Sequence, residues 1–464
     1  LLKAIRDYNC DDCESTWRLA EWLRTVGRGN GIEYIPPPSP PEKKVGDDAH
    51  PSTLLAEKLL QQVNDGKISD PNQAEIQRLL AYLLEYHWRE AKPVFWAMFA
   101  RSEMTEQELV DDFDCLGGLE RTAKPPVQVR RSLVYEYQFD PDQDTKLHEG
   151  SSCYFAHDLS VTTTIETFDA ERGLVEIKLG AKKGEPPKRL CLIPSEYITA
   201  KTIADAVFRY VDAWSGGTIL SQAVGDLLHR RAPRLKNHRD GPIISDDDLL
   251  AASVDVVSRM QNTVLCIQGP PGTGKTHTAA QAILELMRKG KKVGVTANSH
   301  KAILNVLRAI HDAKHAAGAD FSIVKVGEAE DDPLIDSGAI EQIKDAKEAC
   351  HSLGNAPIVM GGTAWLFSRP ELQGAFDYLF IDEAGQFSLA NTVAVGISAK
   401  NLVLVGDQMQ LAQPVLGTHP GKSGHSALNY LLDGHATIPP AMGIFLGQTW
   451  RLHPDICGFL SAAV

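Results

Sequence analysis

One glycine-rich segment has the residue types and the spacing needed to hold a phosphate chain. It reads GPPGTGKT over residues 269–276, so Gly269, Gly274, Lys275 and Thr276 fit the pattern G-x-x-x-x-G-K-[ST]. The glycines let successive backbone N–H groups point at one phosphate, the lysine supplies a positive charge, and the threonine hydroxyl suits Mg²⁺. We therefore predict a triphosphate site formed by these residues: Gly269, Pro270, Pro271, Gly272, Thr273, Gly274, Lys275, Thr276 and His277.

A second segment, DYLFIDEAGQ, supplies the acidic groups that such a site needs. Asp382 and Glu383 directly follow an apolar run at 378–381 that reads as a buried strand. Ligands of open parallel sheets collect at the carboxyl ends of the strands. We predict that Asp382 and Thr276 hold the Mg²⁺ and that Glu383 aligns or deprotonates an attacking water.

The elements that must position these residues alternate in type from about residue 250. Apolar runs (TVLCIQ, KVGVTA, FSIVKV, PIVMGG, YLFIDE and NLVLVGD) alternate there with helical patterns, which indicates an α/β fold with a parallel sheet covered by helices on both faces. Several short β-rich runs at 130–199 suggest a small β-barrel, with DAERG at 169–173 as a hairpin turn. The segments around this barrel have helical patterns.

Four motifs, taken in order, resemble those of superfamily 1 helicases. GPPGTGKT, IDEAGQ, LVGDQMQL and TWRLHPDI are similar to motifs I to IV, and the nearest group is superfamily 1B, which includes the nonsense-mediated-decay helicase. The resemblance covers residues 250–464 and implies a RecA-like motor that hydrolyses ATP with Mg²⁺ and moves along single-stranded nucleic acid. It implies that Gln410 senses the γ-phosphate and that Arg451 reaches it from the domain seam. The catalytic residues so implied are Lys275, Glu383, Gln410 and Arg451.

Two further strand ends carry candidate contacts to a nucleic-acid strand. TANSHKAI, at 296–303, is similar to the family segment that grips the strand backbone, and GGTAWLF, at 361–367, occupies a comparable position. Hydroxyl, amide and N–H groups there can bind phosphates, and an aromatic ring can stack on a base. Helix capping and ordinary core packing are the alternatives. The candidate nucleic-acid residues are Thr296, Asn298, Ser299, His300, Thr363 and Trp365.

The N-terminal segment YNCDDCEST resembles the last motif of RNase H-like 3′–5′ exonucleases. Tyr8 and Asp12 fit its Y-x-x-x-D pattern, in which the aspartate binds a catalytic metal, so Asp12 is a vestigial metal ligand in this interpretation. The whole arrangement resembles bacterial fusions of a RecB-like or RNase H-like nuclease with a superfamily 1 helicase. Two-metal chemistry needs several carboxylates, and we expect the others upstream of Leu1, so no nuclease activity is expected from this chain. A plain surface helix is the alternative.

These features predict a chain cut at both ends and divided into six segments. A second RecA-like domain is expected beyond Val464, and we expect weak ATP–Mg²⁺ binding and slow hydrolysis without it. The predicted segments are the remnant of an RNase H-like nuclease (1–30), a proline-rich linker (31–50), a helical region (51–129), the small β-barrel (130–199), a helical stalk and connector (200–248), and the first, truncated RecA-like motor domain (249–464).

The net charge, the apolar runs and the cysteine content of the chain exclude some classes of protein. The net charge of −13 argues against coating nucleic acid by bulk charge, and no apolar run is long enough to cross a membrane. Eight scattered cysteines in 464 residues fit a reducing cytoplasm. We expect a monomeric motor on single-stranded nucleic acid, with DNA slightly favoured over RNA by the nuclease-like segment. A nucleotide-switched clamp and a P-loop kinase or GTPase are the alternatives. Many relatives read adenine with a glutamine upstream of the P-loop, but LLAASVDVV (249–257) has none.

Overall fold

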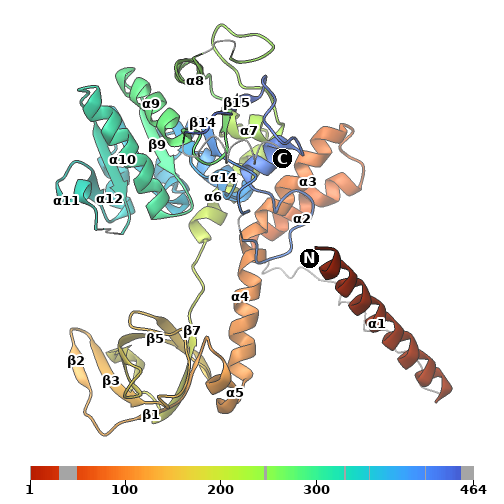
Figure 1. Ribbon diagram of the computed structural model, residues 1–464, viewed down its shortest axis with the longest axis vertical. Helices are drawn as coiled ribbons and strands as arrows, with labels where there is room; N and C mark the ends of the chain where they lie inside the picture. The colour runs from red at the N-terminus through yellow and green to blue at the C-terminus, as the bar shows by residue number, and fades with distance from the viewer. Residues whose placement is uncertain are drawn as a thin grey trace. The chain divides into compact units, whose positions relative to one another are not determined.

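The computed structural model describes residues 2–30, 50–244, 248–328, 331–354, 356–412 and 414–450 (Figure 1). The chain divides into two units, residues 1–50 and 51–464. The first unit contains the helix α1 (Leu2–Gly29), on which Trp17 and Trp22 are exposed. Asp12 lies in this helix, but its side chain is outside the described set.

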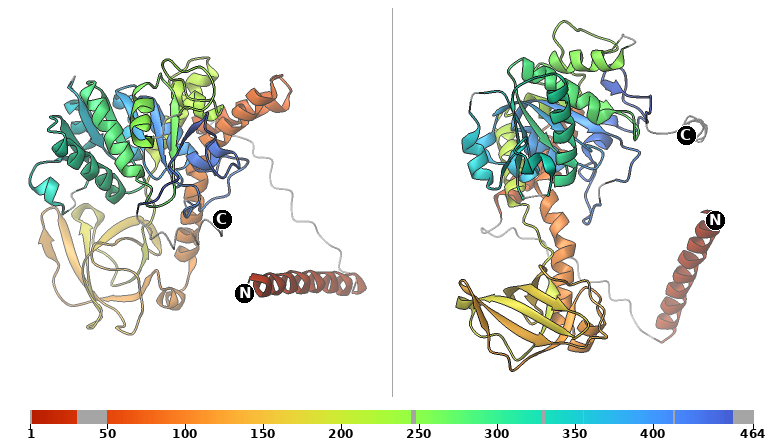
Figure 2. Two further views of the ribbon diagram at one scale, coloured as in Figure 1. Left: turned by 45° about the horizontal axis from the view of Figure 1, so that its top comes forward. Right: turned by 60° about the vertical axis from the view of Figure 1, so that its left-hand side comes forward.

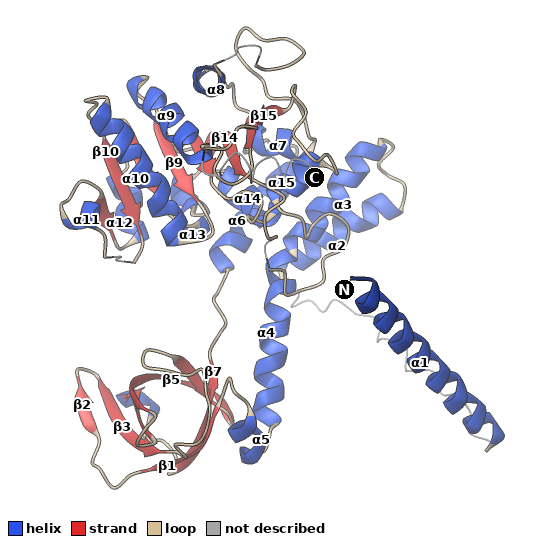
Figure 3. Ribbon diagram, viewed as in Figure 1, coloured by secondary structure: helices blue, strands red, loops and turns tan. Residues whose placement is uncertain are grey.

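The second unit contains a sheet of eight parallel strands in the order β11-β10-β12-β9-β13-β14-β8-β15 (Figure 3). The six strands that the sequence predicts all form. The two edge strands β11 and β15 are short and were not predicted. The strands are β8 (Val264–Gln268), β9 (Lys292–Thr296), β10 (Ser322–Val326), β11 (Glu341–Ile343), β12 (Ile358–Gly361), β13 (Phe376–Ile381), β14 (Ala399–Gly406) and β15 (Gly443–Phe445).

Side chains alternate between the two faces of this sheet and enter two separate cores. On β13, Leu379 and Ile381 belong to one core, whereas Tyr378 and Phe380 belong to the other. This period of two is what a strand buried on both faces requires. The predicted α/β fold, with helices on both faces of a parallel sheet, is therefore confirmed.

One face of the parallel sheet is covered partly by helices from segments 51–129 and 200–248, which were predicted to lie outside the motor domain. Helices α2, α3, α6 and α7 share one core with α14 and with one face of the sheet, so they complete the packing of the sheet. Helices α8, α9 and α10 cover the opposite face. The helices are α2 (Pro51–Asn64), α3 (Pro71–Leu84), α4 (Tyr86–Glu103), α5 (Glu106–Asp111), α6 (Lys201–Ser215), α7 (Gln222–Leu228), α8 (Leu249–Ser258), α9 (Lys275–Arg288), α10 (His300–Ala316), α11 (Pro333–Asp336), α12 (Ala346–Ser352), α13 (Ala364–Phe367), α14 (Leu389–Gly396) and α15 (Ala427–Leu432).

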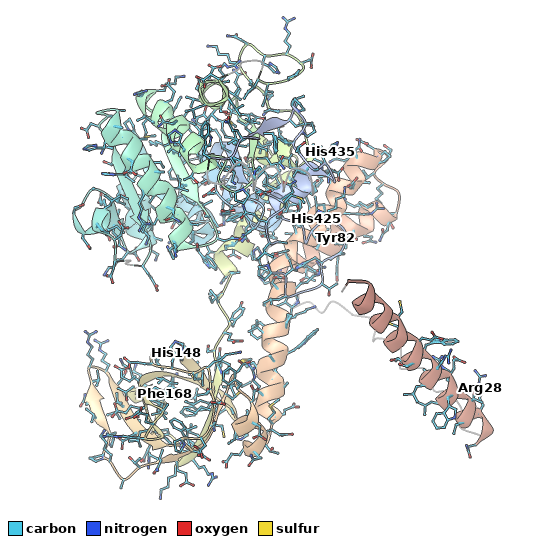
Figure 4. The ribbon with its side chains drawn as sticks, viewed as in Figure 1. Arg28, Tyr82, His148, Phe168, His425 and His435 are labelled. Atoms are coloured by element: carbon cyan, nitrogen blue, oxygen red, sulfur yellow. The ribbon has the colours of Figure 1, made fainter. Side chains whose placement is uncertain are left out.

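A closed antiparallel barrel precedes the parallel sheet (Figure 2). Its strands pair in the ring β1-β7-β4-β5-β6-β3-β1, and β2 pairs with β3 at the side. The predicted hairpin turn forms between β5 and β6, and Phe168 stacks on Phe139 at 5.3 Å between ring centroids (Figure 4). The strands are β1 (Leu116–Arg121), β2 (Val127–Val129), β3 (Ser132–Gln138), β4 (Ser152–Phe155), β5 (Asp158–Asp169), β6 (Leu174–Gly180) and β7 (Arg189–Pro194).

The barrel begins earlier than predicted, which corrects the boundary at residue 130. Strand β1 starts at Leu116, inside the segment predicted to be helical to residue 129. Its sequence LGGLER contains two glycines, and glycine disfavours strands, so the pattern gave no β signal. The register shifts between Leu116 and Leu119, and Gly118 has a φ of +65°. The glycines therefore form a bulge within the strand.

The loop that follows β14 is tied to α4. Pro93 inside α4 has no N–H, which leaves the carbonyl of Arg89 without its helical donor. The loop passes here at Gly417, where a Cβ atom would lie 2.5 Å from the Arg89 carbonyl oxygen. The Glu90 carboxylate accepts the N–H groups of Leu416 (3.2 Å) and Gly417 (2.8 Å) and contacts His419 Nε2 at 2.6 Å. No described helix is long and apolar enough to serve as a membrane span.

Candidate nucleotide-binding site

The loop between β8 and α9 has the shape that its sequence predicts. Gly269 must be glycine, because a Cβ atom would lie 2.5 Å from Thr273 Oγ1 and 2.9 Å from the Leu446 carbonyl oxygen. The Lys275 ammonium donates to the carbonyls of Gly269 (2.7 Å) and Pro270 (3.1 Å), which places the charge over the loop. No described side chain caps α9 at Gly274, so the first N–H groups of the helix face the loop. This end of α9 can attract an anion.

The acidic pair lies at the end of the central strand β13. The Asp382 N–H donates to the Thr296 carbonyl on β9 at 2.9 Å, which fixes the start of the turn. Glu383 has a φ of +51°, a left-handed conformation that strains a residue with a long side chain. Burial, and then the charge of Glu383, raises the pKa of Asp382 to about 6, although Lys275 opposes the rise. An additional positive charge at this position would therefore be favourable.

One cavity of about 550 Å³ brings the two segments together. Neighbouring strands β8, β14 and β13 end at the same edge of the sheet, which places the loop, the acidic pair and the segment after β14 side by side. Gln410 reaches the cavity from that last segment. The lining residues are Pro271, Gly272, Gly274, Lys275, Thr276, His277, Asp382, Glu383, Gln410 and Trp450. Of the other predicted residues, Gly269 and Pro270 belong to the same loop, Thr273 lines a second cavity, and Arg451 lies outside the described residues.

The second cavity, of about 720 Å³, adjoins the first and shares Gly274, His277 and Trp450 with it. Its apolar wall includes Leu249 and Leu250 at the start of α8. Trp450 is a residue that sequence reasoning missed as a site residue. Its N–H donates to the Gly272 carbonyl at 2.8 Å, and its side chain is 76% exposed. The sequence feature that could have identified Trp450 is its position next to Arg451 in TWRLHP. A segment that brings this arginine to the phosphates must run beside the phosphate loop at 269–276.

Comparison with known proteins gives matches in the same part of the chain. Residues 246–355 match the family described as "AAA domain". The chain is 28% identical over 200 residues to the DNA replication ATP-dependent helicase/nuclease DNA2 of Saccharomyces cerevisiae, which is 40% of this chain and 12% of that protein. It is 31% identical over 164 residues to the protein of the same name from Schizosaccharomyces pombe, which is 34% of this chain and 11% of that protein.

A solved structure described as an arterivirus nonstructural protein 10 (helicase) with DNA is also similar. It shares 13% identity, with a TM-score of 0.33, over 73% of this chain and 57% of that one. Both curated relatives are named as ATP-dependent helicase/nucleases. The chain spans about a tenth of the length of these curated relatives.

The candidate nucleic-acid residues of TANSHKAI divide into different roles. Thr296 is fully buried at the end of β9, so its hydroxyl cannot reach a bound strand, and this candidate is corrected. Ser299 caps α10, because its hydroxyl accepts the Ala302 N–H at 3.1 Å. This is the helix capping that was predicted from the sequence as the alternative to strand binding. The His300 ring packs against Gly327, where a Cβ atom would lie 2.6 Å from His300 Cε1. Asn298 is exposed, and its amide donates to the Gln386 carbonyl.

The two candidates of GGTAWLF lie at the carboxyl end of β12. Thr363 is partly buried and is the N-terminal boundary residue of α13. Trp365 is 41% exposed, so it is not an ordinary core aromatic. Its indole N–H donates to the Thr199 carbonyl at 2.9 Å, which fixes the ring. Asn298, Ser299 and Trp365 are exposed, and His300 and Thr363 are partly buried, so Thr296 is the candidate whose side chain lies out of reach of a strand.

Proposed function

We propose that the chain contains an ATP-hydrolysing motor whose hydrolysis is coupled to movement along single-stranded nucleic acid. We further propose that the whole protein joins this motor to a nuclease, as the names of the matched relatives suggest. One observation carries the proposal: Lys275, Thr276, Asp382, Glu383 and Gln410 line a single cavity, although they come from three separate segments. Phosphoryl-transfer sites of this type work by positioning and by charge.

The side chains of the cavity fit ATP and Mg²⁺. The Thr276 hydroxyl and the Asp382 carboxylate are hard oxygen ligands of the kind that Mg²⁺ prefers, and Mg²⁺ would neutralise charge on the phosphates. Lys275 would move from the loop carbonyls to the β- and γ-phosphates. Glu383 would hold the attacking water and accept its proton. Gln410 would contact the γ-phosphate, and it lies on the loop after β14 that is hydrogen-bonded to Glu90 of α4.

We propose that the base of the nucleotide lies in the second cavity against Trp450. The indole offers an exposed face, and Leu249 and Leu250 complete an apolar wall. A stacking contact of this kind accepts any purine. The upstream segment 249–257 has no glutamine to read adenine, so we expect weaker selection of adenine than of the triphosphate.

The remaining assignments rest on sequence and on the relatives. DNA is favoured over RNA by the words "DNA replication" in their names. All seven described cysteines are free thiols, which fits a reducing, cytoplasmic environment. We propose a motor that acts as a monomer, in a protein whose nuclease is of the RNase H-like or RecB-like type and includes α1 and Asp12.

Steady-state ATP hydrolysis by the chain tests the proposal. Wild-type protein is compared with Lys275→Ala, with and without Mg²⁺, and with single-stranded DNA and RNA side by side. Lys289→Ala, at the other end of α9 in an exposed pair with Glu285, is the matched control. We expect Mg²⁺-dependent hydrolysis that a single strand stimulates and that only Lys275→Ala abolishes, with an unchanged melting curve. Equal hydrolysis by Lys275→Ala would exclude the proposed phosphate site.

A further inference from the structure

Helix α4 carries a stripe of exposed and partly buried aromatic residues that the nucleotide site does not use. Trp88, Phe95 and Phe99, together with Lys92, are spaced by four, three and four residues, so they share one helix face. Trp88 is 57% exposed and Phe99 is 52% exposed. A contiguous exposed patch of large apolar side chains often marks a binding surface.

The stripe continues onto the segment between β7 and α6. The ring of Phe95 lies 6.3 Å from that of Trp88 and 4.6 Å from that of Tyr197, measured between centroids. Ile198, the next residue, is 76% exposed. The Thr199 carbonyl then accepts the indole N–H of Trp365 at 2.9 Å. The segment 197–199 thus joins α4 to Trp365.

We name Trp88, Lys92, Phe95, Tyr197 and Trp365 the aromatic track. Trp365 is the second residue of α13, which begins three residues after the end of β12 at the carboxyl edge of the sheet. That edge also holds the nucleotide cavity and the candidate strand contact Thr363. The track therefore extends the surface on which a strand is proposed to lie.

The charges along α4 favour a polyanion. The Lys92 ammonium lies 5.7 Å from the Trp88 ring centroid, and no described carboxylate forms an ion pair with it. The nearby acids have polar partners of their own: Glu85 pairs with Arg89 at 2.5 Å, and Glu90 contacts His419 and accepts two loop N–H groups. A partly exposed cation beside an exposed ring suits a phosphate beside a stacked base.

We propose that the aromatic track binds single-stranded nucleic acid through base stacking on Trp88 and Tyr197 and through a phosphate contact to Lys92. The proposal rests on the proposed function, because it lengthens the strand site of that motor. The net charge of −13 gives no general attraction for nucleic acid, so a long strand must be held by local contacts of this kind. Stacking on one ring is tolerant of sequence, as a moving motor requires.

Fluorescence anisotropy with oligo-dT of about 8 and about 24 nucleotides tests the track, because a strand of about 24 nucleotides exceeds a single site of about 4–16 nucleotides and offers further bases to α4. The variants are Trp88→Ala, Trp88→Phe and Lys92→Ala. Phe113→Ala is the matched control, since Phe113 is 52% exposed and has the Lys146 ammonium 5.2 Å from its ring centroid, but lies outside α4. Binding of a fluorescent ATP analogue is measured on the same samples.

We expect Trp88→Ala to weaken binding of the longer strand by about 5- to 150-fold, the value of one stacked base. Trp88→Phe restores much of the affinity, Lys92→Ala weakens it at low salt, and the shorter strand and the control are unaffected. A 5-iodouracil strand crosslinks to the peptide that contains residues 86–103.

Equal binding of the longer strand by wild type and Trp88→Ala would overturn the track and leave the motor proposal intact, provided that the shorter strand still binds. Absence of binding of either strand to the wild-type chain would overturn both. Loss of self-association in Trp88→Ala, without any effect on strand binding, would make the stripe a contact between copies and would also overturn the track.

Discussion

Replacing Asp382 by asparagine should stabilise the nucleotide-free protein. Burial and the neighbouring charge of Glu383 raise the pKa of this carboxyl from an ordinary 3.8 to about 6. In the unfolded chain the group has its ordinary pKa. At pH 7.5 the ionised carboxylate therefore lowers the free energy of unfolding by about 3 kcal/mol relative to a neutral group. The substitution Asp382→Asn would remove that charge while keeping the size of the side chain.

The stability gained by Asp382→Asn should depend on pH. Because the folded pKa lies above the unfolded one, the disadvantage is absent below pH 3.8 and develops as the pH rises from 3.8 to 6. The gain from Asp382→Asn should therefore be about 3 kcal/mol at pH 7.5 and about half of that at pH 5. Urea unfolding of both proteins in EDTA at the two pH values measures it.

Asp377 on the same strand provides a control of opposite sign. Burial alone would raise its pKa, but hydrogen bonds from Lys400 (2.9 Å) and from the Lys292 N–H (3.1 Å) outweigh burial and lower the pKa. Asp377→Asn should destabilise the protein, and by similar amounts at pH 7.5 and pH 5, because both values lie above the pKa of the unfolded group. A loss of stability in Asp382→Asn, or a gain that is the same at both pH values, would refute this reasoning.

Two further changes test other parts of the structure. Glu383→Gln should reduce the rate of ATP hydrolysis by about 10²- to 10⁴-fold, because the proton acceptor is lost; binding of a fluorescent ATP analogue should be unchanged, and a variant with normal turnover would contradict the role of Glu383. Gly417→Ala should lower the free energy of unfolding by about 1–3 kcal/mol, since its Cβ atom would meet the Arg89 carbonyl oxygen at 2.5 Å. Gly354→Ala, which has nothing within 4 Å, should be neutral, and equal effects at the two glycines would disprove the close contact.

The central strands and the phosphate loop were readable from the sequence, because both signals are local. An apolar run such as YLFIDE has few alternatives once helices alternate with it, and the spacing of Gly269, Gly274 and Lys275 is set by the phosphate. The adjacency of the loop to Asp382 followed from the rule that ligands collect at the carboxyl ends of parallel strands.

Other features depend on contacts that no local pattern records. Strand β1 was missed because its two glycines form a bulge whose pairing partner lies on β7, far along the chain. Thr296 reads as a polar strand end, and only the position of β9 inside the sheet shows that it is buried. The packing of α2, α3, α6 and α7 against the motor sheet could not be predicted either, because apolar helix faces do not specify which surface they meet.

The most direct test of the nucleotide site is a crystal structure of the chain with a non-hydrolysable ATP analogue and Mn²⁺ in place of Mg²⁺. The anomalous signal distinguishes the metal from a water molecule. We predict a single Mn²⁺ at the phosphates, bound by the Thr276 hydroxyl at about 2.1 Å and adjacent to the Asp382 carboxylate, with Lys275 on the γ-phosphate. A metal or triphosphate bound away from residues 269–276 would contradict the account.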